Sequence, residues 1–228
     1  MNIRPNWQHC SRSATQFKIP VPLGIEEAIL PKTAPPKATA PRGVLSLKVT
    51  LKDTKPPIWR RILVPDSINL GDLHLAIQIA MGWHVCHLHV FDIGGERYGD
   101  PNTADDVANE RRMKLSALVK AGVTSFTYTY DFGDNWEHAI LIEKSPPPNA
   151  AHAYPAVIAG KRHCPPEDCG GTWGYTELLE IVANPAHPEY EERLGWFGED
   201  NFDPEAFSID AADRMLALAF RRKTPPTA

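Results

Sequence analysis

The sequence predicts an α+β fold, in which antiparallel hairpins form a mixed or antiparallel sheet and a C-terminal group of helices follows. Apolar and polar residues alternate in pairs of short runs between residues 44 and 143, a period of two that is typical of half-buried strands. After residue 171, apolar residues instead recur at helical spacing, and Thr172 or Gly174, Pro188 and Ser208 stand at expected helix starts. The order of the two patterns therefore places the sheet before the helices.

The proline content divides the 228 residues into three parts. Residues 1–42 contain seven of the 22 prolines, and such a composition does not sustain a regular helix or strand. We expect a flexible arm over residues 1–42, a single α+β domain over residues 43–221 and a loose tail over residues 222–228.

The composition is that of an ordinary soluble domain, with 43% hydrophobic and 23% charged residues. No apolar run approaches the ~20 residues that a membrane-spanning helix needs, and the start MNIRPNWQHC lacks the apolar core of a secretory signal. We therefore expect a cytoplasmic protein without a membrane partner. Its net charge of −4 gives no global attraction to nucleic acid, so a nucleic-acid role would depend on a local basic patch.

The clearest predicted hairpin runs from Phe126 to Glu143. Its two strands alternate around Gly133, Asp134 and Asn135, residue types that tolerate the positive φ of a tight reversal. The polar side chains Asp131, Asp134 and His138 lie near its tip, beside aromatic residues. These three side chains are therefore candidates for a catalytic site.

An earlier predicted hairpin pairs residues 44–51 with residues 58–64 and is rich in basic residues. Lys48, Lys52, Arg60 and Arg61 could contact phosphates, together with Trp59. The alternative is the solvated face of an antiparallel sheet. Arg60 and Arg61 are neighbours on a strand and point to opposite faces, so a flat basic surface can contain only one of them.

A helix is predicted from a cap at Ser67 or Asn69 to Gly82, and a strand from residue 84 to Ile93. His87 and His89 would point the same way on that strand, so they could hold one metal ion or share a catalytic proton. Residues 101–113 are polar and predict a surface loop, and a short helix closed by Gly122 follows.

The stretch from residue 154 to residue 175, YPAVIAGKRHCPPEDCGGTWGY, predicts an irregular loop because of its prolines and glycines. Cys164 and Cys169 enclose four residues, a spacing at the outer edge of zinc-ligand pairs. Glu167 and Asp168 could form a hydrated turn, or a carboxylate pair that meets the histidines.

Several motifs in the same order resemble a known family. They are IWRRILVP, LHLAIQIAMGW followed by HLHVF, YDFGDNWEHAI, CPPEDCGG with a following GY, and FDPEAF. Together they are similar to the plasmid Ri third-open-reading-frame family, whose members are sometimes labelled as passenger, TnpR-type proteins of insertion elements. The resemblance covers about residues 44–210 and implies an α+β domain without an established activity.

The family pattern corresponds here to a set of polar, aromatic and glycine positions: Trp83, His87, Asp131, Asp134, Trp136, His138, Glu167, Asp168, Gly170 and Gly171. The TnpR label would suggest a resolvase. The sequence contains no helix-turn-helix with a basic recognition helix, so that activity is not carried over.

Three functional hypotheses follow. The first is an uncharacterised plasmid- or mobile-element-associated protein that serves as a ligand-binding or accessory module. The second is a metal-dependent hydrolase with a divalent metal such as zinc. Its candidate metal ligands are His87, His89, His138, Cys164 and Cys169, and its candidate catalytic residues are His87, His138, Asp131, Asp134, Glu167 and Asp168. The third is nucleic-acid binding through the first, basic hairpin.

Overall fold

The computed structural model describes residues 43–104, 106–149, 153–195 and 202–221. The predicted arm, residues 1–42, and the predicted tail, residues 222–228, lie outside this part of the chain.

The described residues form an eight-stranded sheet in the order β5-β4-β3-β6-β7-β1-β2-β8. Every neighbouring pair is antiparallel except β4 and β5, which are parallel. The α+β class is thereby confirmed. The strands are β1 (Val44–Leu51), β2 (Trp59–Pro65), β3 (His89–Ile93), β4 (Glu96–Gly99), β5 (Ala108–Asn109), β6 (Ser125–Tyr130), β7 (Trp136–Glu143) and β8 (Ala156–Lys161).

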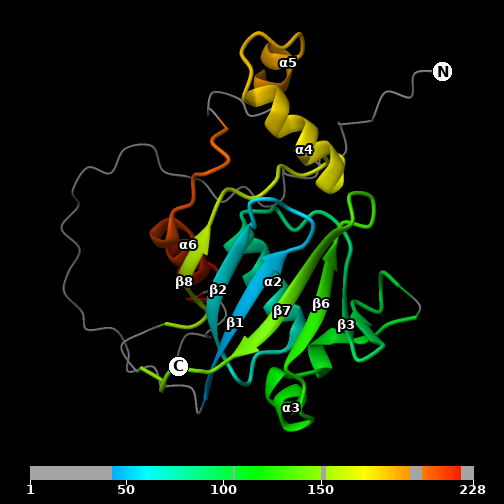
Figure 1. The fold of residues 1–228 in the computed structure, drawn as a ribbon. Helices are drawn as coiled ribbons and strands as arrows, with labels where there is room; N and C mark the ends of the chain where they lie inside the picture. Colours follow the sequence, from blue (N-terminus) through cyan, green and yellow to red (C-terminus); the bar gives the residue numbers. More distant parts are fainter. Residues whose placement is uncertain (1–42, 105, 150–152, 196–201, 222–228) are drawn as a thin grey trace. The chain divides into compact units, whose positions relative to one another are not determined.

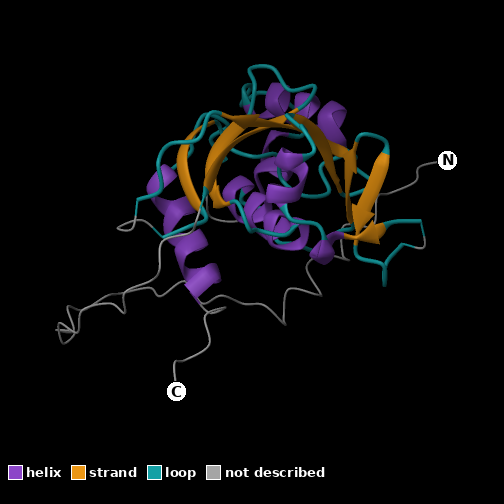
Figure 2. Cartoon of the chain, turned by 90° about the horizontal axis from the view of Figure 1, so that it is seen from below, coloured by secondary structure: helices purple, strands orange, loops and turns teal. Residues whose placement is uncertain are grey.

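The described helices are α2 (Leu70–Met81), the 3₁₀ helix η2 (Glu110–Arg112), α3 (Leu115–Lys120), α4 (Gly171–Val182), α5 (Tyr190–Leu194) and α6 (Ile209–Arg221). Helices α2 and α6 pack against the sheet, whose curvature is visible in Figure 2, whereas α4 and α5 extend away from it in Figure 1. Helix α2 lies behind the central strands and α6 lies beside β8 (Figure 1). Within the described ranges no helix is both long and apolar enough to span a membrane.

Helix α2 begins and ends where its sequence signals predict. The Asn69 side chain accepts a hydrogen bond from the Asp72 N–H at 2.8 Å, and Gly82 ends the helix at φ 102°. Leu73 and Ile77 are fully buried in the shared core with the sheet. The helix therefore covers one face of the sheet, and the loops that carry the polar side chains lie at the strand ends.

The hairpin of β6 and β7 has the predicted alternation. Tyr128, Tyr130 and Trp136 are fully buried in the core. At the tip, Asn135 has the positive φ that its residue type predicts, 54°. Asp131 also has a positive φ, 56°, whereas Gly133 does not. Asp131 therefore follows a strand whose aromatic side chains are buried in the core.

The strand predicted from residue 84 begins only at His89, so His87 and His89 do not share a strand face. Val85 has a φ of 60°, which turns the chain out of the extended conformation. The prediction that His87 and His89 point the same way on one strand is therefore wrong.

Two further stretches are more regular than predicted. Residues 101–113 include β5 and η2, in which Glu110 is buried. Strand β8 lies in the stretch predicted to be irregular, where it pairs with the outer side of β2. Pro155 directly precedes β8, which is an edge strand of the sheet. A proline in this position does not interrupt the hydrogen bonds between strands, so it is compatible with β8.

Arg60 is a buried cation that joins β2 to its surroundings. Its side chain donates to the backbone oxygens of Ala80, Trp59, Lys161 and Arg162 at 2.8–2.9 Å. The guanidinium also lies 3.7 Å from the centre of the Phe207 ring, and the residue is only 1% exposed. Burial lowers the Arg60 pKa to about 10, so the group remains charged at neutral pH.

We predict that Arg60→Met destabilises the protein by about 3 to 5 kcal/mol, because four backbone carbonyl groups lose their donor and two of these hydrogen bonds, to Ala80 and Arg162, are buried. The matched control is Arg61→Met on the same strand, whose partner Glu143 is only partly buried. That change should cost about 1 kcal/mol or less. Chemical denaturation measures both free energies of unfolding, and equal losses would contradict the anchoring role of Arg60.

Candidate metal centre

Three loops meet at one end of the sheet and bring polar side chains together. The first, residues 84–88, leads into β3, and the second is the β6–β7 tip with Asp131 and Asp134. The third, residues 162–170, leads into α4. The Asp131 N–H donates to the Leu88 oxygen at 2.8 Å, which holds the first loop against the hairpin tip.

His87 lies between two carboxylates from the other two loops. Its Nε2 atom is 3.6 Å from Asp131 Oδ2 and 3.4 Å from Asp168 Oδ1. This nitrogen is buried and has no hydrogen-bond partner among the described residues. A buried imidazole nitrogen without a partner is costly, so its position between two carboxylates calls for an explanation.

The two carboxylates have different environments. Asp131 is buried, and its Oδ1 accepts the Gly133 N–H at 2.9 Å, which leaves Oδ2 facing His87. Asp168 is about one third exposed. Burial raises the pKa of Asp168, and the nearby Asp131 and Glu167 charges raise it further, whereas His87 lowers it. The cluster therefore carries negative charge that a cation would stabilise.

Glu167, beside Asp168, is the most firmly held carboxylate of the site. Its oxygens accept the Tyr130 hydroxyl at 2.6 Å, His84 Nδ1 at 3.0 Å and the Cys86 thiol at 3.2 Å. Burial alone would raise the Glu167 pKa, but these hydrogen bonds outweigh burial and lower it to about 2. In return, the hydrogen bond to Glu167 raises the pKa of His84.

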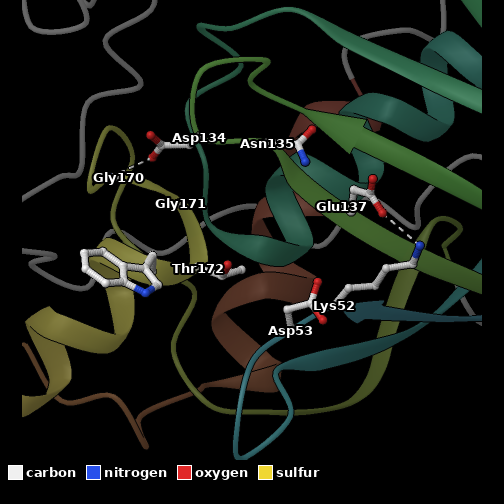
Figure 3. Close-up of a pocket in the computed structure, with 9 residues that line it drawn as sticks. Lys52, Asp53, Asp134, Asn135, Glu137, Gly170, Gly171 and Thr172 are labelled. Atoms are coloured by element: carbon white, nitrogen blue, oxygen red, sulfur yellow. Dashed lines mark hydrogen bonds and ion pairs between the residues drawn. The ribbon is translucent and has the colours of Figure 1, made fainter.

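Asp134 connects this cluster to a cavity of about 310 Å³. The Gly170 N–H donates to Asp134 Oδ2 at 3.2 Å, and Lys52 and Glu137 line the opposite side of the cavity, where they form an ion pair of 2.8 Å (Figure 3). Burial raises the pKa of Asp134, and the neighbouring Asp131 charge contributes. A carboxylate with a raised pKa at the edge of a cavity is a candidate proton acceptor.

Glycine is required where α4 approaches the hairpin tip. Gly171 has a φ of 68°, and a Cβ atom there would lie 2.5 Å from the Asp134 backbone oxygen. The adjacent Trp173 side chain, which also lines the cavity, is 85% exposed.

The other predicted histidine ligands lie elsewhere. His89 Nε2 is 2.7 Å from Glu110 Oε2, and its ring stacks on His74 at 3.5 Å. His138 is fully buried, with its ring edge against Trp83 and its Nδ1 3.3 Å from the Tyr128 oxygen. Neither belongs to the two His, Cys, Asp or Glu groups among the described residues whose ligand atoms lie close enough for one ion.

The predicted cysteine ligands are also placed apart from those groups. Cys164 and Cys169 are buried in the core, and burial raises the pKa of both thiols. Neither thiol belongs to a group of ligand atoms close enough for one ion in the described part of the chain.

The predicted nucleic-acid residues do not form an open basic patch. Arg60 is buried, Arg61 is paired with Glu143 at 2.6 Å, and Lys52 is paired with Glu137 at 2.8 Å. Lys48 lies 5.6 Å from the centre of the Trp59 ring. The acidic partners come from β7, which the sequence places far from the first hairpin.

Sequence reasoning missed Cys86, His84 and Tyr130 as members of the site. The sequence pattern placed Tyr130 on the buried face of its strand, and its hydroxyl contacts the site from within the core. The adjacency of Cys86 to His87 was the available signal, because neighbouring cysteine and histidine residues supply two metal-ligand types at once.

Comparison with known proteins agrees with the motifs of the sequence. A family model described as plasmid pRiA4b ORF-3-like protein matches residues 43–211. The uncharacterized protein y4hQ of Sinorhizobium fredii is 40% identical over 187 residues, which cover 79% of this chain and 96% of that protein. The crystal structure of MM3350, a protein of unknown function from Methanosarcina mazei Go1, aligns with a TM-score of 0.68 and 42% identity, over 73% of this chain and 96% of that one.

The buried histidines predict acid sensitivity of the fold. Burial lowers the pKa of His138 from 6.5 to about 4, and that of His74 from 6.5 to about 2. The unfolded chain therefore binds more protons than the folded chain below pH 6.5, so stability is lost as the pH falls. His138 alone contributes about 3 kcal/mol of this loss between pH 6.5 and pH 4.

Denaturation at a series of pH values checks this expectation. His138→Asn should show a shallower fall in the free energy of unfolding between pH 6.5 and pH 4, whereas His187→Asn, at a partly exposed histidine, should match the native chain. A His138→Asn profile parallel to the native one would contradict the argument.

Proposed function

The chain belongs to the plasmid pRiA4b ORF-3-like family, and on the geometry of its three-loop site we propose that it is a metal-binding module for a divalent ion such as zinc. The observation that carries the proposal is the buried Nε2 of His87, which makes no hydrogen bond among the described residues and lies between the carboxylates of Asp131 and Asp168. A metal ion would bind this nitrogen and both carboxylates at once.

The spacing of the three ligand atoms supports such an ion. Zinc binds histidine nitrogen and carboxylate oxygen at about 2.0–2.2 Å in tetrahedral sites, so two of its ligands stand roughly 3.3–3.6 Å apart. The distances from His87 Nε2 to the two carboxylate oxygens are 3.6 and 3.4 Å. These three protein ligands leave one position of a tetrahedral site for a further ligand, which is a water molecule in catalytic zinc sites and a fourth side chain in structural ones.

The test is zinc titration of the full chain by calorimetry, compared with the double variant Asp131→Asn, Asp168→Asn. Both residues have positive φ, 56° and 59°, which asparagine tolerates well, and the amide oxygen introduced at position 131 can still accept the Gly133 N–H. We expect the variant to fold and to lose zinc affinity by roughly 100-fold or more, since it lacks both anionic ligands.

Asp53→Asn is the matched control, because Asp53 also has a positive φ, 58°, and lies in the β1–β2 turn outside the ligand cluster. It should bind zinc as the native chain does. Thermal unfolding gives a second reading, since zinc at about 100 times its dissociation constant stabilises the native state by about 2.7 kcal/mol. Equal affinities of the native chain and the double variant would overturn the proposal.

Metal-dependent hydrolysis is the second candidate function, favoured by the raised pKa of Asp134 beside the cavity. A bound zinc ion would make water a competent nucleophile near neutral pH. Asp134 would accept the proton at its carboxylate, while the cavity between the β6–β7 tip and α4 would receive the substrate.

Assays of the zinc-loaded chain against ester, phosphoester and peptide substrates test this candidate. Asp134→Asn should lower kcat by roughly 100-fold or more while leaving zinc affinity unchanged, because Asp134 acts on the proton and not on the ion. The amide oxygen of the variant still accepts the Gly170 N–H, which preserves the loop. Full activity in Asp134→Asn would exclude Asp134 as the base.

A further inference from the structure

A second group of ligand atoms shares His87 with the first. Cys86, His87 and Glu167 each offer a ligand atom, and the three atoms lie within 4.8 Å of one another. Cys86 and His87 are adjacent in the chain, as are Glu167 and Asp168. Two dipeptides, each with two potential ligands, therefore face each other across the site.

The Tyr130 hydroxyl holds these dipeptides together. It accepts the backbone N–H groups of Cys86 at 3.1 Å and His87 at 3.3 Å, and it donates to Glu167 Oε1 at 2.6 Å. A hydroxyl has one proton to donate and two lone pairs, so its capacity is fully used. The backbone of Cys86 is thus fixed beside His87, while its side chain remains accessible to solvent.

We propose that Cys86 supplies a thiolate ligand to the metal ion held by His87, which makes the centre selective for borderline-soft ions such as zinc over magnesium and calcium. The inference builds on the proposed metal-binding function and names the class of ion. Thiolate ligands favour zinc and its analogue cobalt, whereas magnesium and calcium take oxygen ligands.

Metal binding by Cys86 requires that its thiol lose a proton. The Cys86 thiol donates to Glu167 Oε2 at 3.2 Å. On metal binding the S–H bond breaks, a sulfur–metal bond forms, and the proton leaves to solvent, so no oxidant or reductant is needed. Glu167 Oε2 then loses one donor but keeps His84 Nδ1 at 3.0 Å.

Cobalt spectroscopy of the full chain tests the inference, because a thiolate bound to Co²⁺ produces an intense near-ultraviolet charge-transfer band that nitrogen and oxygen ligands do not. The native chain should show this band with one equivalent of Co²⁺, and excess zinc should abolish it. Excess magnesium should leave it unchanged. Cys86→Ser should lose the band while still binding Co²⁺, roughly tenfold or more weakly.

Cys164→Ser is the control, because this described cysteine belongs to neither ligand group, and it should keep the band. Co²⁺ binding by the native chain without a thiolate band would overturn the role of Cys86 and leave the proposed metal-binding function intact. A band that survives in Cys86→Ser would also overturn it. Absence of any Co²⁺ or zinc binding would overturn the inference and the proposed function together.

Discussion

The candidate site depends on the hydrogen bonds of the Tyr130 hydroxyl group. It sits at the end of β6, where the strand leaves the core, and it bonds to residues 43, 44 and 37 positions away in the chain. Burial and the hydrogen bond with Glu167 raise the Tyr130 pKa far above its ordinary value, so the group keeps its proton and its direction of donation. A rigid strand thus positions two loops that have little regular structure of their own.

The two neighbouring arginines of β2 point to opposite faces of the sheet and have different kinds of partner. This difference decides whether the first hairpin can bind phosphate. Arg60 gives its donors to backbone carbonyls and stabilises the contact between β2, β8 and the end of α2. Arg61 points the other way and is paired with Glu143 of β7. Of the four basic residues proposed to contact phosphates, Lys52 and Arg61 are therefore paired with acidic residues of β7 and Arg60 is buried, which leaves Lys48 as the one without a buried or ion-paired position among the described contacts.

Local patterns predicted the strands but not their partners. The alternation around Tyr128 and Trp136 identified β6 and β7 because one face of each is buried against α2 and the core. The strand predicted through His87 was wrong because Val85 adopts a left-handed conformation that apolar periodicity does not reveal. His87, Asp131 and Asp168 were each candidates, yet their meeting depends on the sheet order, in which β3 pairs with β6 and α4 follows a loop across both strand ends.

The histidines show why residue type alone could not identify the site. Burial holds His74 and His138 neutral, and their ring contacts with Tyr128 give them structural roles in the core. His89 satisfies its Nε2 with Glu110. The Nε2 atoms of His87 and His138 are both buried without a hydrogen-bond partner among the described residues, but only the Nε2 of His87 lies between two carboxylates from different loops. The neighbouring charges therefore distinguish the proposed ligand from three packed histidines that look equivalent in the sequence, and these charges come together only at the strand ends.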